Sequence, residues 1–181
     1  KGLAEGTSQE EEAFKIELLM KQAHISTDDR KVVQAALEKA KTTDGPAAAL
    51  ELPDGQIITG KTTPLLGACA ALLLNALKAL AGLQDELHLI SPEVIEPIQK
   101  LKTEYLGSVN PRLHTDEILI ALSISAATDE NAQLALEQIP KLAGCQAHTS
   151  VMLSSVDIKQ FKRLNIQITS EAKYENNKIY H

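Results

Sequence analysis

Residues 55–62, "GQIITGKT", match the letter pattern of a phosphate-binding loop, Gly-x4-Gly-Lys-Thr. The variable positions of such loops are small and flexible, because successive backbone N–H groups must converge on the phosphates. Here they include Ile57 and Ile58, whose β-branched side chains favour a straight strand after the turn signal at residues 53–55. No later expected strand ends in an aspartate suited to magnesium, so we interpret the match as coincidental.

The end of this segment is nevertheless a candidate anion site. Lys61, Thr62 and Thr63 lie where the expected strand meets a long apolar helix. The N-terminus of that helix would offer unpaired N–H donors and a positive potential. We expect a phosphorylated small molecule to bind there with Lys61 as counter-charge. The alternative is that Thr62 or Thr63 only caps the helix.

A second polar cluster lies in the loop at residues 108–117, "SVNPRLHTDE". Arg112 offers a planar fork for carboxylate or phosphate, and His114 can carry a proton near neutral pH. Both are therefore candidate catalytic residues. The alternative is an Asn-Pro turn, a surface arginine and a helix cap at Thr115.

Cys145 and His148 invite comparison with a cysteine nucleophile and its base. Cys145 is accordingly a third catalytic candidate, although residues three apart near a strand start also suit structural roles. The sequence leaves open whether the domain is an enzyme, and it indicates no particular cofactor.

Composition excludes several classes of function. The 181 residues carry a net charge of −6, with 44% hydrophobic and only 3% aromatic residues. Such a chain can build a core of Leu, Ile, Val and Ala, but it suits neither phosphate-backbone binding nor base stacking, so we expect no nucleic-acid partner. The apolar stretch at 65–74 is too short to span a bilayer. No signal peptide is evident and both cysteines suit a reduced state, so we expect a cytoplasmic location.

The elements that must position these residues alternate between helices and strands. We expect a loose segment at 1–9 and a single α/β domain at 10–181, with Ser26 or Thr27 capping its second helix. A helix starting at Pro97 should turn Ile98, Leu101 and Tyr105 inward. Helices are expected at 10–23, 26–41, 62–83, 97–107 and 157–165, and strands in a hairpin around 53–55 and at 86–91, 148–154 and 167–172.

Residues 115–142 are expected to form an inserted helical hairpin. The apolar run at 118–127 suits either a buried strand or a buried helix, but "TDE" at 115–117 is a good helix start and favours a helix.

Three segments of the chain are highly specific: "LPDGQIITGKTTPLLGACAALLLNALKALAGL", "HLISPEVIEPIQKLK" and "NPRLHTDEILIALSISAATDE". They closely resemble a bacterial family known as domain of unknown function 1846, and the likeness extends from Glu10 to His181. The family is about two to three times longer than this chain. The resemblance therefore implies the C-terminal part of a longer protein, and it brings no activity with it.

The order of helices and strands and some short sequence segments also resemble the cytidine-deaminase-like fold, which implies a three-layer α/β core. Cys69 matches a zinc-ligand position of that family, but Ala71 stands where its proton-shuttling glutamate belongs. Glu93 and Glu96 stand at two further zinc-ligand positions, which hold cysteines in the family. The resemblance therefore implies no working deaminase. It leaves open an altered metal site of Cys69, Glu93 and Glu96, or carboxylates that are simply solvated.

Two functional expectations follow. In the first, the domain contributes to a small-molecule or phosphorylated-ligand site of a multidomain enzyme, in a polar pocket that joins Lys61, Thr62 and Thr63 to Arg112 and His114. In the second, the domain is a non-catalytic assembly module. Its Ala- and Leu-rich helices would then pack against copies of itself, as a homo-oligomer, or against its own N-terminal region.

Overall fold

The computed structural model describes residues 30–172. The helix expected at 10–23 and the caps expected at Ser26 or Thr27 lie outside these residues. The first described helix, α2, spans Lys31–Thr43, and its N-cap is Arg30.

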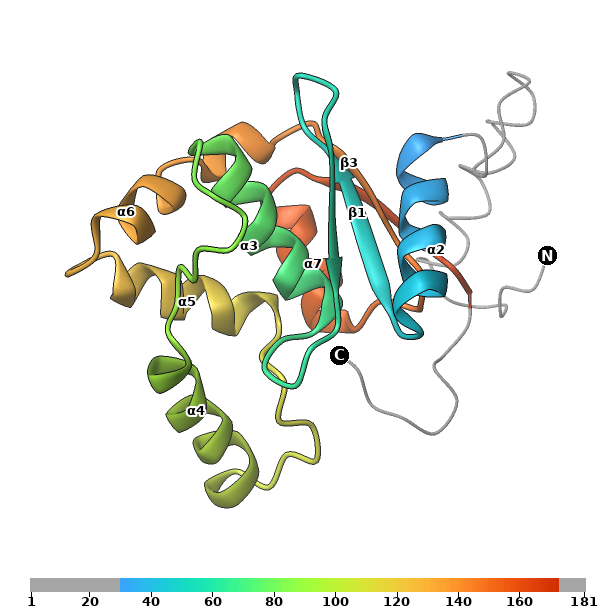
Figure 1. Cartoon of the computed structure of the whole chain (residues 1–181). Coiled ribbons are helices and arrows are strands. Elements are labelled where there is room, and N and C mark those ends of the chain that lie inside the picture. The colour runs from blue at the N-terminus through green and yellow to red at the C-terminus, as the bar shows by residue number, and fades with distance from the viewer. Residues whose placement is uncertain (1–29, 173–181) are drawn as a thin grey trace.

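A four-stranded mixed sheet forms the centre of the domain, in the order β2-β1-β3-β4 (Figure 1). The strand β1 pairs antiparallel with both β2 and β3, whereas β3 and β4 are parallel. The turn expected around residues 53–55 is confirmed, because it joins β1 to β2. The strands span Ala47–Glu51 (β1), Ile57–Lys61 (β2), Gln146–Thr149 (β3) and Gln167–Ser170 (β4).

Helices cover both faces of the sheet, as Figure 1 shows, which confirms the α/β class. On one face, Ala49 of β1 packs with Val32, Val33 and Ala36 of α2. On the other face, side chains of β1 and β3 pack on α3, spanning Ala68–Leu80, and on α7, spanning Ser155–Arg163. The core on this second face includes Ala48, Leu50, Leu72, Leu73, Leu77, Ala147 and Phe161.

The segment 115–142 is helical, as expected. It contains α5 (Thr115–Ser125), α6 (Glu130–Leu136) and a 3₁₀ turn at Ile139–Leu142. Asp129 caps α6 by accepting hydrogen bonds from the backbone N–H groups of Asn131 and Ala132. The ambiguous apolar run at 118–127 is therefore resolved as helix up to Ser125.

The strand expected at 86–91 is wrong, because these residues form a loop. The buried ammonium of Lys78 donates hydrogen bonds to the carbonyl oxygens of Asp85 (2.6 Å) and Leu87 (3.1 Å). Leu89 and Ile90 are nevertheless buried in the core. The Lys78 side chain thus provides hydrogen bonds to loop carbonyls that would otherwise need the N–H groups of a neighbouring strand.

The helix after this loop starts earlier than expected. It is α4, spanning Pro92–Lys100 with Pro97 inside it, and a π-helical turn continues it over Leu101–Tyr105. Ile98 is partly buried as predicted, but the inward orientation predicted for Leu101 and Tyr105 is wrong, since they are 47% and 70% exposed.

Both glycines of the phosphate-loop pattern have structural roles. Gly55 adopts φ +92° in the β1–β2 turn, a conformation that side chains disfavour. A Cβ on Gly60 would lie 2.6 Å from Leu72 Cα and 2.9 Å from Ala68 O, both backbone atoms of α3. Gly60 therefore allows α3 to lie directly against β2, and the motif follows from helix packing on a strand.

Gly60→Ala is expected to destabilise the domain by about 3 kcal/mol or more, because neither backbone can move aside cheaply. Urea unfolding of the variant beside the parent measures the difference. Gly45→Ala is the matched control, since no atom lies within 4 Å of a Cβ there, and its effect should stay within about 0.5 kcal/mol. Equal stability of Gly60→Ala and the parent would contradict this account of the motif.

Candidate functional site

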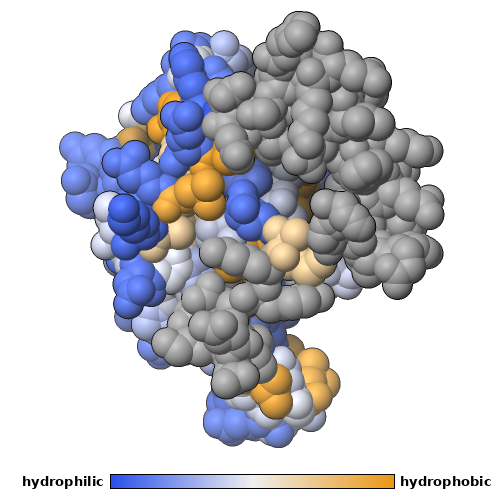
Figure 2. Space-filling model, turned by 90° about the vertical axis from the view of Figure 1, so that its right-hand side faces the viewer, coloured by the Kyte–Doolittle hydropathy of each residue, from blue (hydrophilic) through white to orange (hydrophobic). Residues whose placement is uncertain are grey.

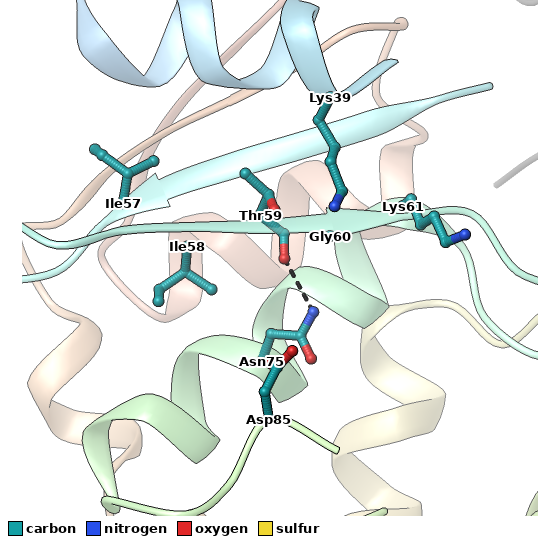
Figure 3. Close-up of a pocket in the computed structure, with 8 residues that line it drawn as sticks. All are labelled: Lys39, Ile57, Ile58, Thr59, Gly60, Lys61, Asn75 and Asp85. Atoms are coloured by element: carbon teal, nitrogen blue, oxygen red, sulfur yellow. Dashed lines mark hydrogen bonds between the residues drawn. The ribbon is translucent and has the colours of Figure 1, made fainter. Parts of the chain in front are cut away.

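A hollow of about 360 Å³ runs along the outer edge of β2 and is here termed the β2-edge hollow (Figure 3). Its residues come from α2, β2, α3 and the loop after α3, so it combines segments far apart in the sequence. It is lined by Lys39, Ile57, Ile58, Thr59, Gly60, Lys61, Asn75 and Asp85.

β2 presents unpaired backbone groups to this hollow. In an antiparallel ladder, every second residue directs its N–H and C=O toward the partner strand. Thr62 N donates to Pro46 O at one end of the β1–β2 ladder, and Leu52 N donates to Gln56 O at the other. The even-numbered residues of β2 are therefore the ones whose backbone groups face β1. Ile57, Thr59 and Lys61 therefore point their backbone groups away from β1. The amide of Asn75 donates to Thr59 O at 2.9 Å, which satisfies one of these carbonyls (Figure 3).

Two lysines line the hollow, and neither is ion-paired within residues 30–172. Lys61 lies on the same face of β2 as Ile57, which packs toward α2, and Lys39 is supplied by α2 itself. Neither ammonium forms an ion pair or a hydrogen bond with another described residue. The one carboxylate in the lining, Asp85, follows α3, which packs on the opposite face of the sheet.

The expected helix N-terminus at Thr62 and Thr63 is wrong. α3 begins only at Ala68, with Gly67 as its N-cap. The hydroxyl of Thr63 instead accepts hydrogen bonds from the backbone N–H groups of Leu65 (3.1 Å) and Leu66 (3.0 Å). This turn holds residues 63–66 outside the helix, so Lys61 ends a strand and Thr62 and Thr63 belong to a loop.

The two loops that carry the predicted site residues do meet. Arg112 Nε donates to Thr63 O at 2.6 Å, and Leu113 N donates to Leu65 O at 3.0 Å. Leu66 and Leu113 form a parallel bridge. Arg112 therefore ties the loops together, but no residue of the second loop lines the β2-edge hollow.

Thr62 and His114 each carry a buried polar atom that has no partner among the described residues. These atoms are Thr62 Oγ1 and His114 Nδ1. His114 is also the N-cap of α5, a place predicted for Thr115, and its backbone N–H donates to Glu117 Oε1 at 2.8 Å. His114 thus has a clear structural role at the helix start.

Cys145 and His148 lie on opposite faces of the sheet. Cys145 belongs to the core on the α3 side. His148 is fully buried on the other side, with Nδ1 2.7 Å from Thr169 Oγ1 and Nε2 2.8 Å from Glu171 Oε2. The predicted pair is therefore not arranged as a nucleophile and its base.

Cys69 is buried at the start of α3, beside a polar cluster. Asp157 is buried too, and its Oδ1 accepts a hydrogen bond from the Thr115 hydroxyl at 2.7 Å. Burial raises the pKa of the Cys69 thiol well above its ordinary value, and the negative charge of Asp157 raises it further, while a hydrogen bond with Thr149 opposes the shift.

The predicted metal ligands are not brought together. Glu93 and Glu96 are exposed on α4, whereas Cys69 is buried in the core. Within residues 30–172, no group of three or more His, Cys, Asp or Glu side chains is arranged to hold a metal ion.

Sequence reasoning identified Lys61 but missed Lys39, Asn75 and Asp85 as residues of the hollow. From the sequence, Lys39 was expected on a charged, solvated helix face, and Asp85 was expected to lie beside a strand. Only Asn75 carried a signal, because it is a polar residue in an almost wholly apolar helix.

Both cysteines should resist alkylation in the folded protein. Burial also raises the pKa of Cys145, as does the charge of Glu51, so at pH 8 each thiol holds less of the reactive thiolate than an exposed cysteine. Iodoacetamide labelling followed by mass spectrometry should give rates at least ~10-fold below those in urea, with Cys69 slower than Cys145. Labelling of Cys69 at its rate in urea would contradict its burial.

The structure offers no membrane span within residues 30–172, where none of the helices is both long enough and apolar enough to cross a bilayer.

Comparison with known proteins identifies the family. The model of "Domain of unknown function DUF1846, C-terminal" matches residues 28–180. A UPF0371 protein of Corynebacterium aurimucosum is 59% identical over 165 residues, which cover 91% of this chain and 32% of that protein. A UPF0371 protein of Streptococcus pyogenes serotype M5 is 49% identical over 166 residues, covering 92% and 34%. The chain thus spans about a third of the length of these relatives, and it belongs to the DUF1846 family as its C-terminal domain.

Proposed function

We propose that this domain binds a small phosphorylated molecule in the β2-edge hollow and contributes that site to a larger, multidomain enzyme. The observation that carries the proposal is the pair of lysines, Lys39 and Lys61, which line the same hollow and form no ion pair with another described residue. Two like charges repel unless an anion lies between them, and phosphate is a common partner of lysine.

The other groups of the hollow suit the rest of such a ligand. The outward N–H groups of Thr59 and Lys61 are donors that can support an anion. Asp85 would repel a second phosphate but can accept a hydrogen bond from a hydroxyl or amino group. A volume of about 360 Å³ lies in the range of small-molecule sites. The ligand class is therefore a monophosphate that also carries a hydroxyl or amino group.

The proposal places the chemistry with the longer protein. The described residues do not pair Cys145 with His148 as nucleophile and base, and the relatives are about three times as long as this chain. Active sites are often completed at the boundary between domains. Two buried free cysteines also fit the reducing conditions of the cytoplasm.

The alternative function, an assembly module, was expected to use the Ala- and Leu-rich helices as its contact surface. Ten of the 13 residues of α3 are buried within the domain, so this Ala- and Leu-rich helix offers little apolar surface to a partner. Homo-oligomers and contacts with an N-terminal region stay predictions.

A thermal-shift panel of sugar phosphates, nucleoside monophosphates and inorganic phosphate tests the ligand proposal. A ligand at one hundred times its dissociation constant should stabilise the parent by about 2.7 kcal/mol, which raises Tm by several degrees. Lys39→Ala and Lys61→Ala should each lose most of that shift.

Lys41→Ala is the matched control, because Lys41 is an exposed lysine on α2 that does not line the hollow. It should keep the full shift of the parent. A ligand-induced shift that survives both Lys39→Ala and Lys61→Ala, or no shift with any phosphate of the panel, would refute the site.

A further inference from the structure

Four large apolar side chains are exposed at the end of one projecting element. They lie on the π-helical turn that continues α4 and in the loop after it, and they are here termed the apolar tip. Figure 1 shows α4 extending away from the sheet, and in Figure 2 hydrophobic patches lie beside hydrophilic ones on the lobe at the bottom of the view. The exposed fractions are 47% for Leu101, 70% for Tyr105, 71% for Leu106 and 79% for Val109.

The base of this element is held firmly against the domain. Ile95 of α4 is buried in the core, and Gln99 Nε2 donates to Pro64 O at 3.0 Å. The buried ammonium of Lys102 pairs with Glu117 Oε1 at 2.9 Å and also donates to Arg112 O. Because Lys102 lies within the same turn as the tip, these bonds fix the backbone that carries the exposed side chains.

Exposing the apolar tip to water is energetically unfavourable, and burying it against a partner is favourable. Single exposed apolar residues are common and need no explanation, but several gathered at one end of an element indicate an interaction site. Tyr105 combines a large apolar body with a polar end, as residues that dominate binding energy often do. A preformed tip also loses little conformational entropy on binding.

The size of the tip indicates the kind of partner. A stable interface between separate proteins uses roughly 20 to 30 residues a side, and the tip supplies four. A partner in the same polypeptide needs a smaller interface, because a tether gives an effective concentration of roughly millimolar. The relatives provide such a partner, since about two thirds of their length lies outside the part that this C-terminal domain covers.

We propose that the apolar tip docks into an apolar recess of the region that precedes this domain in the full-length protein. The tip thereby fixes the orientation of the C-terminal domain relative to that region. This inference is independent of the ligand proposed above, because no residue of the tip lines the β2-edge hollow.

Hydrogen–deuterium exchange at residues 101–109 tests the docking. The exchange is measured in this chain alone and in a full-length chimera that joins the preceding region of the Corynebacterium aurimucosum relative to this chain. Exchange at 101–109 should be at least ~10-fold slower in the chimera. Tyr105→Asp with Leu106→Ser should return it to the rate of the isolated chain.

Ile124→Ser is the matched control, since Ile124 is an exposed apolar residue of α5 outside the tip, and it should leave the protection intact. Equal exchange at 101–109 in the isolated chain and in a folded chimera would overturn the proposal. Protection that appears in the isolated chain as its concentration rises would also overturn it, in favour of a second copy as the partner. If this chimera is insoluble, a second chimera with the preceding region of the Streptococcus pyogenes serotype M5 relative gives the same comparison with the tether kept.

Discussion

The close contact between Gly60 and the backbone of α3 is the constraint on which the edge of the sheet depends. Because no side chain separates them, α3 lies directly against β2 and brings Asn75 within hydrogen-bonding distance of Thr59 O. The same helix carries Lys78, whose ammonium binds the carbonyl oxygens of the following loop and places Asp85. The places of Asn75 and Asp85 in the lining of the hollow therefore depend on the missing Cβ of Gly60.

Lys78 illustrates the energetic cost of this arrangement. Burial lowers its pKa, and the charges of Asp85 and Glu86 act in the opposite direction. A buried ammonium is tolerated only where its donors are satisfied, and here two carbonyl oxygens accept hydrogen bonds from it. The hydrogen bonds of this charged residue, in the last turn of a mostly apolar helix, thus help to hold the shape of the loop.

The sequence predicted the parts of the fold that local chemistry determines. Residues 53–55 specify their turn, and "TDE" at 115–117 specifies a helix start, because each signal acts over a few residues. The sequence did not predict the loop at 86–91. The apolar residues of this segment suit a strand, but in the structure Lys78 donates a hydrogen bond to one of its carbonyl oxygens, that of Leu87. Of the charged and amide residues of the candidate site, only Lys61 was predicted from the sequence. Lys39, Asn75 and Asp85 join it through the packing of α2 and α3 on the sheet, which no short stretch encodes. The resemblance to the cytidine-deaminase-like fold is not confirmed.

The central position of β1 has a consequence for how the chain folds. Its partner on one side, β2, follows directly, but Ser150, which binds Ala47 at the other edge, lies 103 positions away. During synthesis the β1–β2 hairpin and α3 can therefore assemble while the edge of β1 that later pairs with β3 is still unpaired. An unpaired strand edge invites pairing with other chains, and closing so long a loop slows folding. The helices between β2 and β3 can form from local contacts in the meantime, so we expect the pairing of β3 with β1 to complete the sheet late in folding.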